Sequence, residues 1–238
     1  MLTAAFLAIV AFVIATGVRA ASRGLPPRTR PRWRTAGLAV AWLALTGALP
    51  LSGLLRPDGP LPAPLFMAVI LAVSVAVAAG APGRRMAAQT PLWALVGFQA
   101  FRLPLELVLH EWVAAGIAPP QMTWTGQNLD IVAGALALVS IPAVRRRPVL
   151  AWVPTVVGLA LLLNVIRVVA LSLPGPLQAF EAPVLLPFRF PHVWIGTVCV
   201  AGALTSHLVA LRALLGQSRL SDGPGRRPDT PPSAATGV

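Results

Sequence analysis

The sequence predicts an all-α membrane protein, a polytopic bundle of about seven transmembrane helices. Of the 238 residues, 56% are hydrophobic and only 11% are charged, whereas roughly a quarter of the residues in a soluble domain are charged. The mean hydropathy is +0.76. The apolar residues gather in seven stretches. Most of these approach the roughly 20 residues that a helix needs to cross the hydrocarbon core.

Segments rich in arginine, proline or glycine separate these stretches, which in chain order are Leu2–Val18, Gly37–Leu55, Leu61–Ala79, Pro91–Trp112, Leu129–Val144, Pro148–Leu173 and Val193–Leu215. The first is expected to be an anchor rather than a signal peptide, because its basic residues follow the apolar run instead of preceding it. The fifth is short for a crossing. Residues 1–215 are predicted to form one transmembrane domain. Residues 216–238 contain almost no large apolar side chain, so a disordered cytoplasmic tail is expected there.

Arginine alternates between the connections of the predicted bundle. All nineteen basic residues are arginine, and fifteen of them lie on the side that the chain reaches after its first, third, fifth and seventh stretches. Because positively charged loops stay in the cytoplasm, the N-terminus is predicted outside and the C-terminus inside a bacterial inner (plasma) membrane. Because the arginines occur in short clusters between apolar runs, they also argue against a nucleic-acid partner. The expected partner is the lipid bilayer.

Polar side chains inside the apolar stretches are the first candidates for function, because a charge at the bilayer centre costs roughly 2.5–3.5 kcal/mol on insertion scales. Four polar residues of the fourth stretch fall within an arc of roughly 80° on a helix, namely Gln99, Arg102, Glu106 and His110. Arg102 and Glu106 are predicted to bind substrate. Alternatively, these two residues neutralise each other and only hold the helix to its neighbours. Pro104 lies within the stripe and predicts a kink there.

The sixth stretch carries a second polar pair, Asn164 and Arg167, which are three residues apart and so share a helix face. Arg167 is predicted either to pair with Glu106 across helices or to hold a substrate carboxylate or phosphate. Asp130, near the start of the fifth stretch, is expected to line the same outer cavity. Asn164 and Asp130 are therefore also predicted to bind substrate.

Three side chains on the outer side are candidates for catalysis, namely His110, Arg167 and His192. Arg167 would orient a substrate, and either histidine would transfer protons. His192 follows a proline-rich segment, 174–191, that is expected to cover the outer end as a semi-rigid lid. No metal site and no cofactor is predicted, since the chain has a single cysteine and no second histidine at zincin spacing. Two residues of the last stretch are expected to serve helix packing, Cys199 and His207.

Four segments between Phe101 and Gly196 carry a resemblance to known proteins: FRLPLELVLHEW, MTWTGQNLDI, NVIRVVALSLPGPLQAF and FPHVWIG. They resemble a group of uncharacterised bacterial multi-pass membrane proteins. More weakly, Asn164, Arg167 and His192 resemble the Asn-x-x-Arg helix and the later His of the exosortase and archaeosortase membrane transpeptidases. Those enzymes require a Cys nucleophile on the preceding helix, whereas the corresponding stretch here contains none. The resemblance implies a shared scaffold more than a shared activity.

The leading hypothesis is an inner-membrane protein with a polar pocket on its extracytoplasmic side, which binds or processes an anionic or peptide-like substrate. The sequence leaves open whether it is an enzyme. One alternative is a transporter, which would need the polar stripe to continue towards the cytoplasm. Another is a non-enzymatic assembly or partner-binding subunit, in which Arg102–Glu106 and Asn164–Arg167 act as clamps within the protein or to a protein partner.

Overall fold

A computed structural model describes residues 1–25, 30–56, 60–175 and 177–221 of the chain. Within these residues the fold is helical, without a strand, and each predicted apolar stretch forms helix. The elements, in chain order, are α1 (Leu2–Ala21), α2 (Arg30–Leu51), α3 (Ala63–Ala79), α4 (Ala81–Gln89), α5 (Leu92–Phe98), η1 (Gln99–Phe101), α6 (Arg102–Ala114), η2 (Pro120–Met122), α7 (Asp130–Arg146), η3 (Pro148–Ala151), α8 (Trp152–Leu171), η4 (Leu186–Phe188), η5 (Ile195–Val200) and α9 (Ala201–Ser221).

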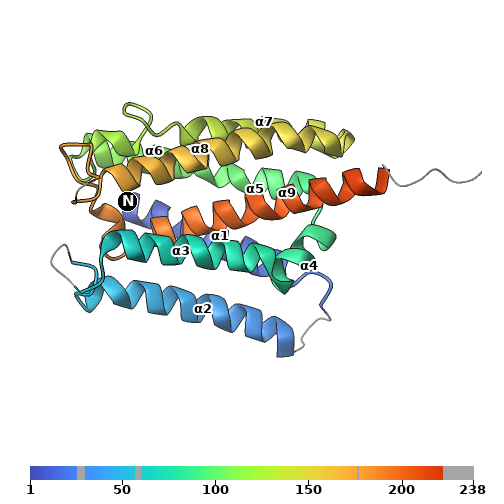
Figure 1. Cartoon of the computed structure of the whole chain (residues 1–238), viewed down its shortest axis with the longest axis horizontal. Coiled ribbons are helices and arrows are strands. Elements are labelled where there is room, and N and C mark those ends of the chain that lie inside the picture. Colours follow the sequence, from blue (N-terminus) through green and yellow to red (C-terminus); the bar gives the residue numbers. More distant parts are fainter. Residues whose placement is uncertain (26–29, 57–59, 176, 222–238) are drawn as a thin grey trace, which may run out of the picture.

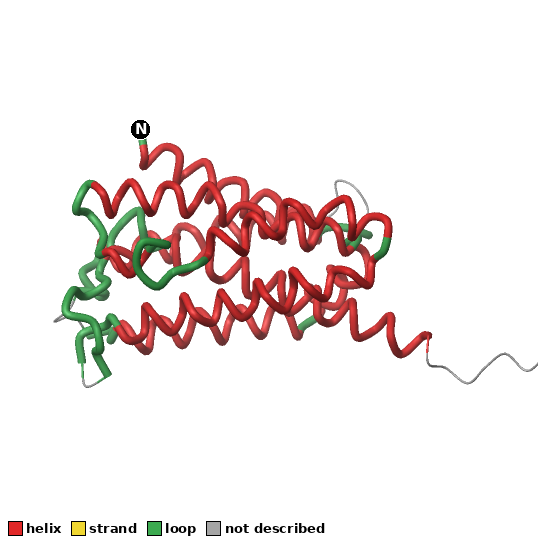
Figure 2. Tube along the Cα trace, turned by 90° about the horizontal axis from the view of Figure 1, so that it is seen from above, coloured by secondary structure: helices red, strands yellow, loops and turns green. Residues whose placement is uncertain are grey.

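The long helices lie side by side along one axis, and successive helices run in opposite directions (Figure 1). The connections therefore gather at the two ends of the bundle (Figure 2). We call the end that holds the N-terminus and the connecting residues 52–56, 60–62, 115–129, 172–175 and 177–194 the loop end. The opposite end, with α4, is the arginine end. α9 packs against α3, α4, α5 and α8 and so forms the centre, whereas α2 lies at one edge (Figure 1).

In the described part of the chain, five helical runs are long and apolar enough to cross a membrane: Leu2–Ala21, Arg32–Leu51, Leu92–Ala114, Pro148–Leu171 and Ile195–Gln217. The pair α3 and α4, bent by 56°, would make a sixth if it is one span. α7, with 17 residues, is not among them. This is the stretch that the sequence already marks as short.

Three helix bounds differ from the sequence prediction. α2 begins at Arg30 rather than near Gly37, so the arginine-rich segment before it is helical. The short helix α4 carries Arg84 and Arg85, which were expected in a loop. α9 continues to Ser221, beyond the predicted boundary at 215, and the rest of the predicted tail, 222–238, lies outside the described residues.

The helical run of the fourth stretch is interrupted where Pro104 predicts. The segment Gln99–Phe101 is a 3-10 turn between α5 and α6. A proline ring clashes with the carbonyl four residues earlier, here that of Ala100, which lies in this turn. The 3-10 turn is thus an irregularity beside Pro104, at the place where the sequence predicted a kink.

Part of the connection 115–129 packs into the bundle, while residues 115–117 and 125–127 stay exposed. Thr123 is fully buried and Asn128 is buried at 4% exposure. Gly126 allows this close approach, because a Cβ there would lie 2.4 Å from the carbonyl oxygen of Pro120. Non-helical backbone at such depth is tolerated in a membrane protein where the surrounding protein covers it. The segment brings polar side chains against α6.

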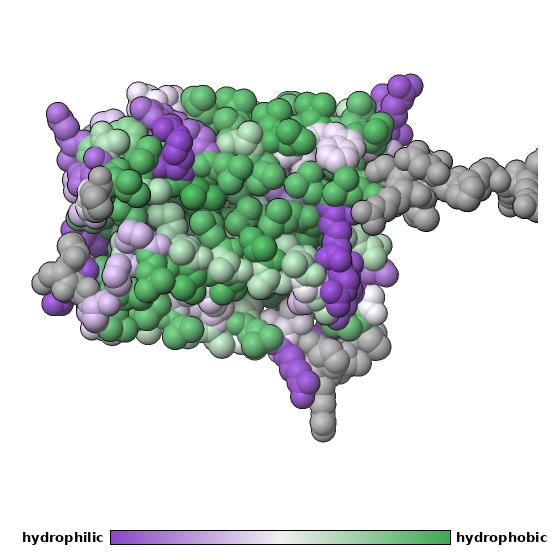
Figure 3. Space-filling model, in the orientation of Figure 1, coloured by the Kyte–Doolittle hydropathy of each residue, from purple (hydrophilic) through white to green (hydrophobic). Residues whose placement is uncertain are grey.

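The outer surface between the two ends is largely apolar, and the hydrophilic residues on the face shown in Figure 3 concentrate towards the ends. Exposed aliphatic side chains such as Leu38, Val139 and Leu163 point outward from three different helices. The described arginine side chains at the arginine end are Arg19, Arg23, Arg32, Arg34, Arg84, Arg85, Arg145, Arg146, Arg147 and Arg212. At the loop end they are Arg56 and Arg189 in the connections, and Arg167 near the end of α8.

Candidate functional site

Arg102 is the centre of a buried polar cluster that joins four helices. Its guanidinium forms a two-pronged ion pair with Asp130 of α7, with Nε 2.7 Å from Oδ2 and Nη2 bonded to Oδ1. Nη1 donates to the carbonyl oxygen of Gly158 on α8 at 2.9 Å and lies 3.2 Å from Nε2 of His207 on α9. Arginine has no acceptor, so Nε2 of His207 accepts and the ring hydrogen is on Nδ1. We call Arg102, Asp130, Gly158 and His207 the Arg102 cluster.

Two glycines make room for these contacts. A Cβ on Gly158 would lie 2.6 Å from Cε1 of His207 and 3.5 Å from Nη1 of Arg102. A Cβ on Gly134, one turn after Asp130, would lie 2.5 Å from the backbone nitrogen of Leu103. Only glycine therefore lets α7 and α8 approach α6 and α9 closely enough for the cluster to form.

Glu106, predicted to pair with Arg102 or Arg167, is bonded to neither. It is 1% exposed, and one of its oxygens accepts a hydrogen bond from Thr123 Oγ1 at 3.2 Å. The other oxygen, Oε1, has no hydrogen-bond partner among the described residues. Arg102 prefers Asp130, which the inward-folding segment brings opposite the guanidinium fork. The expected Arg102–Glu106 neutralisation is thus wrong as a direct pair.

Asn164 and Arg167 do share a helix face, as predicted, and they form a second polar group at the surface. Arg167 Nη2 donates to Asn164 Oδ1 at 3.0 Å and to Gln127 Oε1 at 2.9 Å. Asn164 in turn donates to the backbone carbonyl of Gln127 at 2.7 Å. Arg167 is exposed. We call these three residues the Arg167 group; sequence reasoning did not include Gln127 in it.

His110 and His192 lie in two further places. His110 stacks on Trp124 with ring centroids 4.1 Å apart. His192 lies edge-on to Trp112, with ring centroids 4.7 Å apart, and burial together with the nearby Arg189 charge lowers the pKa of its imidazole. Nδ1 of each ring is buried without a partner among the described residues. Neither ring is in contact with Arg167 in the described chain, so the three catalytic candidates do not form one constellation.

The structure therefore separates residues that the sequence placed in one outer pocket. Arg102, Asp130 and His207 converge, and Glu106 lies beside them, bonded to the same inward-folding segment through Thr123. Arg167, His110 and His192 contact other residues, namely Gln127, Trp124 and Trp112. The spacing of polar residues along each helix was sufficient to find candidates, but it gave no information on which helix would meet which.

A crevice of about 490 Å³ opens at the loop end, where the sequence offered no motif. Its walls are mostly apolar residues from the end of α2, the start of α3 and the segment 174–190, and they include Arg56 and Arg189. Neither guanidinium has a hydrogen-bond or ion-pair partner among the described residues. The only signal in the sequence was that these two arginines fall in connections otherwise poor in arginine.

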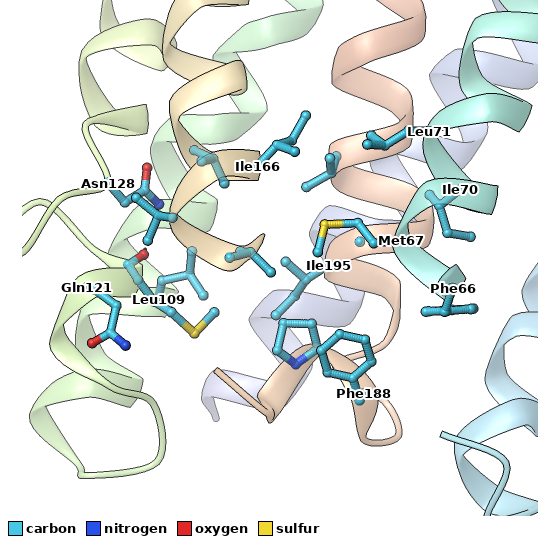
Figure 4. Close-up of a pocket in the computed structure, with 17 residues that line it drawn as sticks. Phe66, Met67, Ile70, Leu71, Leu109, Gln121, Asn128, Ile166, Phe188 and Ile195 are labelled. Carbon is cyan, nitrogen blue, oxygen red and sulfur yellow. The ribbon is translucent and has the colours of Figure 1, made fainter. Parts of the chain in front are cut away.

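A smaller cavity of about 80 Å³ lies between α3 on one side and α6 and α8 on the other (Figure 4). Its lining is apolar except for Gln121 and Asn128. Both carboxamides are already used: Asn128 donates to the carbonyl of Met122 and accepts from the backbone N–H of Asp130, and Gln121 donates to Ser172 and to the carbonyl of Ala182. Asn128 lies one residue before Leu129, the N-cap of α7, and its Oδ1 accepts from the first backbone N–H of that helix.

Metal-binding chemistry has no support in these arrangements. Across the described residues, no group of three or more His, Cys, Asp or Glu side chains is placed to hold an ion. Cys199 is buried at 1% exposure in η5, in keeping with a packing role.

Comparison with known proteins finds no matching protein family, no similar curated protein and no similar solved structure. The function is therefore argued from the chain's own geometry.

Proposed function

We propose that this chain is an integral membrane protein of seven passes, with its loop end outside a bacterial inner membrane, and that it binds an anionic amphiphile in the crevice at that end. The observation that carries the binding proposal is the pair Arg56 and Arg189, which line one crevice of about 490 Å³ among apolar walls without a described partner. An anionic head group would neutralise both guanidinium groups, for which their planar forks are suited.

The orientation is supported by the charge difference between the two ends. Arginine side chains crowd the end at which α9 finishes and are few at the loop end. Short arginine-rich loops remain cytoplasmic during insertion. The apolar surface between the ends supports residence in a bilayer, whose hydrocarbon it would contact (Figure 3).

Binding is proposed rather than catalysis because the described proton-transfer candidates are dispersed. His110, His192 and Arg167 make their contacts in three separate places. Transport is not favoured, because Arg102 and Asp130 satisfy each other in the middle of the bundle. The likeness to the exosortase scaffold remains a prediction that rests on Asn164, Arg167 and His192.

The orientation is tested by labelling intact cells with a thiol reagent that cannot cross the membrane. Ala179 at the loop end and Ala88 in α4 are both exposed. In a Cys199→Ala background, we expect Ala179→Cys to be labelled and Ala88→Cys to react only after the cells are broken. The reverse pattern would refute the orientation, but it would leave the proposal of anion binding in the crevice unaffected.

The binding proposal is tested by thermal unfolding of the purified chain in nonionic micelles. Dodecyl phosphate should raise the melting temperature, since a ligand at about 100 times its Kd stabilises by about 2.7 kcal/mol. The double variant Arg56→Gln/Arg189→Gln should abolish the rise. Arg167→Gln, which removes an exposed arginine outside the crevice, should retain it.

Inorganic phosphate distinguishes a free anion from a lipid-like ligand. If inorganic phosphate alone stabilises the protein as strongly as dodecyl phosphate, the ligand is a small anion and the amphiphile proposal is wrong. An undiminished rise with dodecyl phosphate in the double variant would exclude the crevice as the site.

A further inference from the structure

The crevice and the apolar cavity are neighbours that share one aromatic ring. Phe188 lines both of them. It is 8% exposed and meets Phe66 of α3 edge-on, with ring centroids 6.2 Å apart. In Figure 4 Phe188 lies at one end of the cavity, near Phe66, while Ile166 and Leu71 lie towards the other end. The ring therefore separates a charged compartment from an apolar one.

The cavity behind Phe188 fits hydrocarbon better than water. A cavity holds ordered water when it offers unsatisfied polar partners. Here the two polar lining residues, Gln121 and Asn128, already have protein partners, and the remaining walls are aliphatic, aromatic or thioether. An apolar chain could fill it without leaving a polar group unpaired.

The backbone of η5 leaves space on the same side. Residues Ile195–Val200 form a π-helix, which is wider than an α-helix. Gly196 lines the cavity, and a Cβ on it would meet no atom within 4 Å. The cavity therefore has free space beside Gly196.

From these observations we infer that the crevice and the cavity hold a single anionic amphiphile, with its head group at Arg56 and Arg189 and its hydrocarbon chain passing Phe188 along α3. This inference rests on the proposed function and adds to it the position of the chain. The positive charges of the two arginines place the anionic head group in the crevice. Because Phe188 lines both the crevice and the cavity, the hydrocarbon chain would run from the crevice into the cavity.

A thiol-protection experiment tests the position of the chain separately from head-group binding. Met67 lines the cavity from α3, whereas Val69 points away on the same helix and is 48% exposed. Full-length Met67→Cys and Val69→Cys, both in a Cys199→Ala background, are treated with N-ethylmaleimide in nonionic micelles. Dodecyl phosphate at about ten times its Kd should slow modification of Met67→Cys about tenfold, since roughly a tenth of the sites stay free.

Three controls complete the expected pattern. Ethyl phosphate, which has the head group without the chain, should give no protection of Met67→Cys. Val69→Cys should react at the same rate with and without dodecyl phosphate. Adding Arg56→Gln/Arg189→Gln to Met67→Cys should restore rapid modification.

Each departure from this pattern has a distinct meaning. If dodecyl phosphate gives its arginine-dependent thermal shift but does not protect Met67→Cys, the head-group site stands and the position of the chain is refuted. Equal protection by dodecanol would show that the cavity takes chains independently of the crevice, which overturns the single-ligand inference. Gly196→Cys provides a second reporter; if neither thiol reacts without ligand, the cavity cannot be reached and the inference fails.

Discussion

Arg102 and Arg167 are each bonded to oxygen atoms of neighbouring elements, yet their surroundings differ completely. Arg102 is 1% exposed and donates hydrogen bonds to a carboxylate, a backbone carbonyl and an imidazole on three other helices. Arg167 is exposed and takes carboxamide oxygens from its own helix and from a loop. In the sequence both look alike, as an arginine with a polar residue three or four positions away.

The comparison shows that burial determines how much an arginine and its polar partner contribute to stability. A buried charge that loses its partner is left uncompensated in a medium of low dielectric constant, so breaking the pair is costly even where forming it gained little. An exposed arginine near the end of a span can extend to the aqueous interface, so the loss of its partners costs less. The Arg102 cluster therefore acts as a clamp that holds α6, α7, α8 and α9 in register, and the Arg167 group remains available to molecules outside the protein.

The largest expected effect comes from breaking the clamp on one side. Arg102→Leu leaves the Asp130 carboxylate buried without its cation and should lower the free energy of unfolding by about 3–5 kcal/mol. Unfolding in mixed micelles, followed by circular dichroism, measures it. The double variant Arg102→Leu/Asp130→Leu should lose much less, because it removes both charges; an equal loss would mean that packing, and not charge, dominates the site.

A crowding variant should have the next largest effect. Gly158→Val places a side chain on the Cβ position that lies 2.6 Å from Cε1 of His207, and such overpacking costs about 1–3 kcal/mol. Gly17→Val is the matched control, since a Cβ on Gly17 meets no atom within 4 Å. Comparable melting temperatures for the two variants would show that α8 can move away from α9 without loss.

Removing the exposed arginine should change stability little. Arg167→Leu is expected to alter the free energy of unfolding by no more than about 0.5 kcal/mol, as for surface substitutions elsewhere. The same micelle assay measures it beside Arg102→Leu. A loss similar to that of Arg102→Leu would erase the distinction between clamp and surface group.

The smallest effect is a pH dependence at the loop end. Burial, and then the charge of Arg189, lower the pKa of His192 below its usual 6.5. The imidazole of His192 therefore binds a proton at a higher pH in the unfolded chain than in the folded chain. Above the unfolded pKa its contribution to stability is constant. As the pH falls from the unfolded pKa towards the folded pKa, the protein loses stability. His192→Gln should flatten this part of the stability profile, and a profile unchanged by the substitution would contradict the assignment.

Local chemistry made several features predictable. Apolar runs predicted where helices form, because a run of that length and composition satisfies its backbone only as a helix in a bilayer. Pro104 predicted the break beside it, since the ring excludes a hydrogen bond at a fixed offset. The pairing of Asn164 with Arg167 followed from helical spacing alone.

The partner of Arg102 could not be found in the same way. Helical spacing offered Glu106, four residues on, but Asp130 takes the guanidinium because the connection 115–129 folds inward and presents it. Gly134 and Gly158 carry no polar group, so nothing in the sequence marked them as necessary for the cluster.

By itself, then, the sequence determined the helical class, the apolar stretches and the uneven distribution of arginine, all of which depend on solvent and on neighbours within a turn or two. The tertiary structure alone decided that Arg102 meets Asp130 and His207, and that Arg56 and Arg189 line one crevice. Such meetings depend on how each helix is rotated and how closely it approaches the next. Those quantities are set by packing across the whole bundle, which no local spacing records.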